Sequence, residues 1–178
     1  MLLDDHNFIL HLNHQIIHYK QNILSDQKNG KQGFEIRKRS RICLDFIQRQ
    51  GDTAAQSQLV AFGYVRILII VISTAGGLGE EHDQEINEVL IHISDFLFEL
   101  HKGRNAHLPH FQSESLLARR SIEQIEDEGG NEEIDSQLIN KGKEILFARG
   151  SFKKMANDAK GQILNFYIDK GCKRPWWY

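Results

Sequence analysis

The sequence is poor in the residues that interrupt helices or cross-link chains. Its 178 residues include only two prolines, Pro109 and Pro175, so the first 108 positions contain no proline to break a helix. It also has only two cysteines, Cys43 and Cys172, which are far apart in the chain. We interpret both as free thiols in a reducing compartment rather than as a disulfide framework.

Signals for secretion and membrane insertion are also missing. The N-terminal residues MLLDDHNF have no basic segment before the apolar ones, so we expect no signal peptide. The longest apolar stretch, residues 59–72, contains Arg66 and is shorter than the roughly 20 residues that a bilayer requires. We therefore expect a cytoplasmic protein without a membrane partner.

The sequence lacks the common cofactor and nucleophile motifs. It contains no P-loop, no dinucleotide-binding glycine fingerprint, no set of zinc-binding cysteines and no G-x-S-x-G elbow. Gly76, Gly77 and Gly79 follow a predicted helix rather than a strand, so they give little support for a phosphate-binding loop. No cofactor is expected from these patterns.

Helical periodicity, in contrast, recurs along most of the chain. The first predicted helix begins at Asp4 or Asp5 and ends near Leu24. The other six span approximately residues 34–50, 54–74, 81–102, 115–128, 132–149 and 151–169, with glycine at most of the breaks. We predict an all-α fold, an antiparallel bundle of about seven helices, with a short stack of helical repeats as the alternative. We expect residues 1–170 to form one helical domain and residues 171–178 to form an aromatic and basic tail.

The predicted helix over residues 54–74 is the most apolar. Its run ILIIVI at 67–72 is rich in β-branched residues and is compatible with a buried strand as well. We favour a helix because Leu59, Phe62 and Ile69 continue a longer helical pattern. Thr53 and Gln56 fit a capping box at its start. A segment that is apolar on nearly every side is expected at the centre of the domain.

Charge is distributed in blocks. Residues 1–79 carry 9 basic and 6 acidic residues, residues 80–140 carry 4 and 15, and residues 141–178 carry 9 and 3. Within the acidic block, one helical stripe over about 80° holds Glu81, Glu85, Glu88, His92, Asp95 and Glu99. This stripe is either a solvated face or a docking surface for a basic helix, for which Lys153, Lys154 and Lys160 of the last predicted helix are candidates.

Histidines recur on the first predicted helix. His11, His14 and His18 lie within about 60° of one another and opposite the apolar residues, so they point away from the core. Two histidines one turn apart can bind zinc or another transition metal. The alternatives are a polar face that happens to contain histidine, a subunit contact and a pH-sensitive surface.

The string RNAHLPH at 104–110 resembles the R-N-x(n)-H signature of HEPN-domain ribonucleases. Members of that family are small, all-helical and usually dimeric, and they cut RNA without a metal. The resemblance implies that Arg104 holds the scissile phosphate, that His110 acts as general acid or base, and that Asn105 orders the site. It covers only seven residues, and Pro109 inside the motif is a departure from a regular helix. The alternative is a turn between helices.

Two basic regions are candidates for contacts to nucleic-acid phosphates. One is the second predicted helix, with Arg37, Lys38 and Arg41, and the other is the last, with Lys153 and Lys154. An overall pI near 6.5 argues against general nucleic-acid binding.

The chain ends with KRPWWY, in which Trp176, Trp177 and Tyr178 stand beside cations. Such aromatic residues are costly in water unless they pack on the domain, on another subunit or on a partner. Together with the charge blocks, they favour a non-enzymatic helical interaction module that binds a protein partner or itself. RNA binding, of viral or mobile-element origin, and ribonuclease activity are the alternatives.

Overall fold

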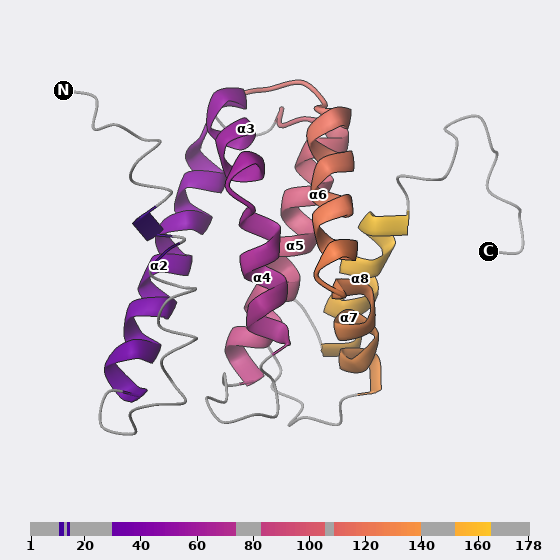
Figure 1. The fold of residues 1–178 in the computed structure, drawn as a ribbon. Coiled ribbons are helices and arrows are strands. Elements are labelled where there is room, and N and C mark those ends of the chain that lie inside the picture. Colours follow the sequence, from indigo (N-terminus) through magenta and orange to yellow (C-terminus); the bar gives the residue numbers. More distant parts are fainter. Residues whose placement is uncertain are drawn as a thin grey trace, which may run out of the picture.

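The computed structural model describes residues 11, 12, 14, 30–73, 83–105, 109–139 and 152–164, and these confirm an all-α multi-helix bundle (Figure 1). Seven helices are described: α2 (Gly30–Gln50), α3 (Thr53–Ala61), α4 (Tyr64–Ile72), α5 (Asp83–Lys102), α6 (Ser115–Asp127), α7 (Gly130–Ile139) and α8 (Phe152–Leu164). The described residues include no strand, only an isolated bridge between Arg104 and Phe111.

The helix predicted over residues 54–74 is two helices, so the prediction of one continuous helix is wrong. Gly63 adopts a left-handed conformation, with φ of +74°, between α3 and α4, and the two helices are bent by 55°. The predicted cap at Thr53 is also wrong, because the Asp52 side chain accepts the hydrogen bond from Ala55 N, at 3.0 Å. Gln56 does not close a capping box, since its side-chain amide donates to two carbonyls at the end of α2.

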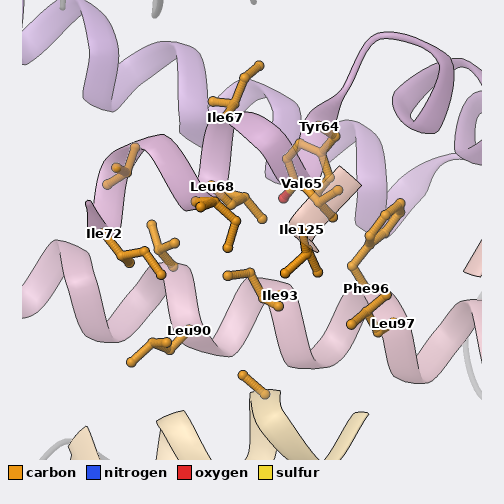
Figure 2. Packing of buried hydrophobic residues seen from close by; sticks show 14 of the residues in the cluster. Tyr64, Val65, Ile67, Leu68, Ile72, Leu90, Ile93, Phe96, Leu97 and Ile125 are labelled. Carbon is orange, nitrogen blue, oxygen red and sulfur yellow. The ribbon is translucent and has the colours of Figure 1, made fainter. Parts of the chain in front are cut away.

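The prediction that residues 67–72 are helical and central is confirmed. Seven of the nine α4 residues are buried. Figure 2 shows Leu68 and Ile72 of α4 on the side that faces α5, where Ile93 lies between the two helices. Tyr64 packs edge-on against Phe96, with ring centroids 5.1 Å apart. Burial of apolar side chains along these two helices is the main stabilising interaction of the bundle.

The remaining helices surround α4 and α5, with α2 at one side of the bundle and α8 at the other (Figure 1). Helix α8 buries Met155, Ala156, Ala159 and Ile163, and it packs against α5 and α7. Arg66 of α4 forms an ion pair with Glu128, which follows α6. Helix α2 buries little apolar surface for its 21 residues, because Leu44 is the only apolar side chain buried among its described side chains, residues 35–50.

Within the ranges described, no single helix is both long and apolar enough to cross a membrane. Helices α3 and α4 reach that length and composition only when taken together as a bent pair.

Candidate functional site

Helix α2 is attached to α5 through polar side chains. Lys38 donates to Glu85 at 2.8 Å, and seven residues further along each helix His92 Nε2 lies 3.2 Å from Asp45 Oδ1. Because low-numbered residues of α2 meet low-numbered residues of α5, these two helices run in the same direction. The hydrogen bond to Glu85 raises the pKa of Lys38, and the negative charge of Glu85 adds to that effect.

Arg49 lies beside the pair that Asp45 forms with His92. Arg49 Nε donates to Asp45 Oδ1 at 3.0 Å, and Arg49 Nη2 lies 3.4 Å from His92 Nε2. Burial lowers the pKa of His92, and the nearby charge of Asp45 opposes this only in part. The imidazole is therefore neutral at pH 7.

Arg104 binds the C-terminal end of α2. Its guanidinium donates to the carbonyl oxygens of Gly51, at 3.0 Å, and Gln48, at 2.6 Å, and it pairs with the Glu99 carboxylate. The Gln56 amide donates to the same two carbonyls, at 3.2 and 2.8 Å. Carbonyls in the last turn of a helix have no partner within that helix, so Arg104 and Gln56 together cap the C-terminus of α2. The guanidinium also stacks on the Phe111 ring, 4.8 Å from its centroid.

A cleft of about 710 Å³ opens beside this cap, between the ends of α2 and α5. Its lining mixes both charges with amides and one exposed aromatic residue: Gln48, Arg49, Gln50, Asp95, Phe98, Glu99, Lys102, Gly103, Arg104 and Asn105. Arg104 lies in the wall of the cleft, but its bonded nitrogens point at protein acceptors. A cleft of this composition has no single charge with which to select a ligand.

An exposed apolar ridge lies on the side of α2 opposite Leu44. Ile42 is 55% exposed and Phe46 is 65% exposed, one turn apart. Exposed charged residues flank them, with Glu35 before and Arg49 after. We call Glu35, Ile42, Phe46 and Arg49 the α2 outer edge.

This outer edge does not follow from the sequence pattern of α2 alone. Helix α2 carries apolar residues around most of its circumference, but only part of them can face the bundle. An excess of apolar residues therefore indicates that some of them are exposed. The structure buries Leu44 and leaves Ile42 and Phe46 exposed. Cys43, on the same helix, is a free and exposed thiol.

The residues predicted from the ribonuclease resemblance are not brought together. Arg104 is 4% exposed and bonded to the protein, whereas Asn105 and His110 are exposed. Two backbone hydrogen bonds between Arg104 and Phe111, at 2.8 and 3.2 Å, close the loop that carries the motif. The cleft is lined by Arg104 and Asn105 but not by His110.

The acidic stripe of α5 is covered in part by α2. Glu85 is 3% exposed and bonded to Lys38, Glu88 accepts from Gln84 at 2.9 Å, and Asp95 lines the cleft. Glu81 lies outside the described residues, as do Trp176, Trp177 and Tyr178 of the predicted tail. The basic helix on this stripe is therefore α2, whereas Lys160 of the last helix pairs with Asp135 of α7.

The predicted basic residues do not share one accessible face. Arg37 and Arg41 are buried, at 4% and 6% exposure, and Lys38 is bonded to Glu85. Lys153 and Lys154 are exposed on α8, on the other side of the bundle (Figure 1).

Among the predicted histidines, His11 and His14 are helical and exposed while Leu12 between them is buried. His18 lies outside the described residues. No group of three or more histidine, cysteine or acidic residues within the described part of the chain is placed to hold a metal ion.

The chain matches no known family model, and no curated protein or solved structure is significantly similar to it.

Proposed function

We propose that this protein is a non-enzymatic helical interaction module that docks another protein surface on the α2 outer edge. The observation that carries the proposal is the pair of large apolar side chains, Ile42 and Phe46, exposed on adjacent turns of one helix. Charged residues flank the pair, and an apolar centre with a polar rim is the usual composition of a protein interface.

Two alternative functions receive less support from the geometry. Ribonuclease activity requires Arg104 to meet a phosphate, but its Nη atoms already donate to two carbonyls and a carboxylate. Binding of RNA along α2 requires a row of accessible cations, but Arg37 and Arg41 are buried. The exposed Arg39 and Arg49 each lie beside a carboxylate, of Glu35 and Asp45.

Photo-crosslinking tests the proposal. Phe46 is replaced by a benzophenone amino acid in the protein expressed in its own cells, and Leu116 of α6, which is 73% exposed, is replaced in the same way as a matched control. We expect a covalent protein adduct from position 46 and none from position 116. Adducts from neither position, or from both equally, contradict the proposal.

A further inference from the structure

The charged ends of the α2 outer edge form a self-complementary pattern. Glu35, Ile42 and Arg49 follow one another at intervals of seven residues, so they lie close to a single line along the helix. Their side chains are exposed to similar degrees, at 57%, 55% and 52%. The line therefore has an acid at one end, a base at the other and an apolar residue midway between them.

This row of residues is complementary to the same row on a second, antiparallel α2 helix. If two α2 helices pack antiparallel about a two-fold axis at Ile42, Glu35 of each copy faces Arg49 of the other, and the two Ile42 side chains meet at the centre. Each Phe46 extends the apolar contact by one turn. A two-fold interface repeats every favourable contact twice, so both ion pairs form together.

Resting on the function proposed above, we infer that the partner on the α2 outer edge is a second copy of this chain, bound antiparallel. The intramolecular contacts of the edge are compatible with this pairing. Arg49 uses Nε on Asp45 and places Nη2 beside His92, and Glu35 faces Arg39 only loosely, at 3.6 Å. One helix from each copy gives a small interface, so the dimer forms at high micromolar concentration rather than at nanomolar concentration.

Charge reversal tests the pairing. Light scattering after size-exclusion chromatography gives the mass of the wild type and of Glu35→Arg and Arg49→Glu. We expect a dimer for the wild type and at least about tenfold weaker association for each variant, because each places like charges opposite one another twice. An equimolar mixture of the two variants restores both ion pairs and should recover a heterodimer. Glu123→Arg, at an exposed site on α6, is the matched control and should leave the dimer unchanged.

Cys43 provides an independent readout. Its thiol is exposed and one residue from the proposed axis, so in a Cys172→Ser background the two copies of Cys43 should be joined by a bismaleimide of about 10 Å, the separation of packed helices. The same reagent should leave Glu35→Arg unlinked.

A wild type that stays monomeric at high micromolar concentration, or a variant mixture that fails to associate, overturns the antiparallel dimer. The photo-crosslinking result then separates the two proposals. An adduct at position 46 with a different protein retains the interaction function and rejects self-association, and absence of any adduct rejects both.

Discussion

Arg104 joins the end of α2, which is distant in sequence, to the end of α5 and to the loop that returns to Phe111. Removing its guanidinium leaves the Gly51 and Gln48 carbonyls with only Gln56 as donor and leaves Glu99 without its cation. We expect Arg104→Ala to reduce the free energy of unfolding by about 3 kcal/mol, the usual cost of breaking a largely buried ion pair. Urea denaturation followed by circular dichroism measures this loss.

His110→Ala is the control for that experiment, because His110 is exposed in the same loop and should change stability by less than about 0.5 kcal/mol. Arg104→Lys should not rescue the loss, since one ammonium group cannot reproduce the planar fork of donors. An Arg104→Ala protein with unchanged stability but lost RNA cleavage would instead support the ribonuclease interpretation.

His92 is expected to make stability depend on pH in a defined direction. Burial lowers its pKa below the ordinary value of 6.5, so the unfolded chain binds the proton at a higher pH than the folded chain. The stability that neutral His92 contributes is present above about pH 6.5 and is lost as the pH falls through the unfolded value toward the folded one. The difference in unfolding free energy between wild type and His92→Gln should therefore shrink between about pH 7.5 and pH 5.5. A difference that grows on acidification would mean that the protonated ring gains more from Asp45 than it loses by burial.

At the scale of elements, two glycines that share a left-handed conformation differ in the space around them. Gly103, with φ of +77°, ends α5, and an added Cβ would lie 2.7 Å from the Phe111 carbonyl oxygen. Gly129, with φ of +68°, joins α6 to α7, and its nearest neighbour would be 3.9 Å away. We expect Gly129→Ala to cost about 1 kcal/mol from the backbone conformation alone and Gly103→Ala to cost at least about 2 kcal/mol more, because backbone must move. Equal losses in thermal unfolding would contradict this comparison.

The positions of the helical segments could be predicted from the sequence. Apolar residues at helical spacing indicate a helix with one buried face, and this holds whichever helix covers that face. The break at Gly63 could not, since an isolated glycine within a helical pattern is often tolerated and only the packing on both sides makes α3 and α4 diverge. The ends of α5 and α6 were placed within about two residues, where Gly103 and Gly129 stop the helices.

The candidate site was less predictable, because the roles of its residues depend on which helices meet. The residues beside Arg104 in the chain single it out, but its role is set by the Gly51 and Gln48 carbonyls, which only the fold brings near. The sequence predicts that the acidic face of α5 is a surface for a basic helix. It does not identify α2 as that helix, because charge alone does not distinguish α2 from α8. The exposure of Ile42 and Phe46 could not be predicted for the same reason. When a helix is apolar on several sides, its own sequence does not show which side is covered.

For the whole molecule, the division between a polar-docked α2 and an apolar centre predicts a hierarchy of stability. The α4 and α5 helices are joined by buried aliphatic and aromatic side chains, whereas α2 contributes Leu44 and a row of polar pairs. Local opening requires less free energy where fewer apolar contacts are broken. In native-state hydrogen exchange, we expect amides near Leu44 to exchange at a lower opening free energy than those of Ile69 and Ile93.

Leu44→Ala sharpens this expectation. The substitution should lower the opening free energy of α2 by about 2–3 kcal/mol, within the usual range for a buried leucine, and change that of α5 much less. Ile42→Ala, at an exposed position on the same helix, is the matched control and should change neither in the monomer. Identical protection of α2 and α5 in the wild type, with both reduced together in Leu44→Ala, would show that the bundle opens as one cooperative unit and that the polar row binds α2 as firmly as an apolar face.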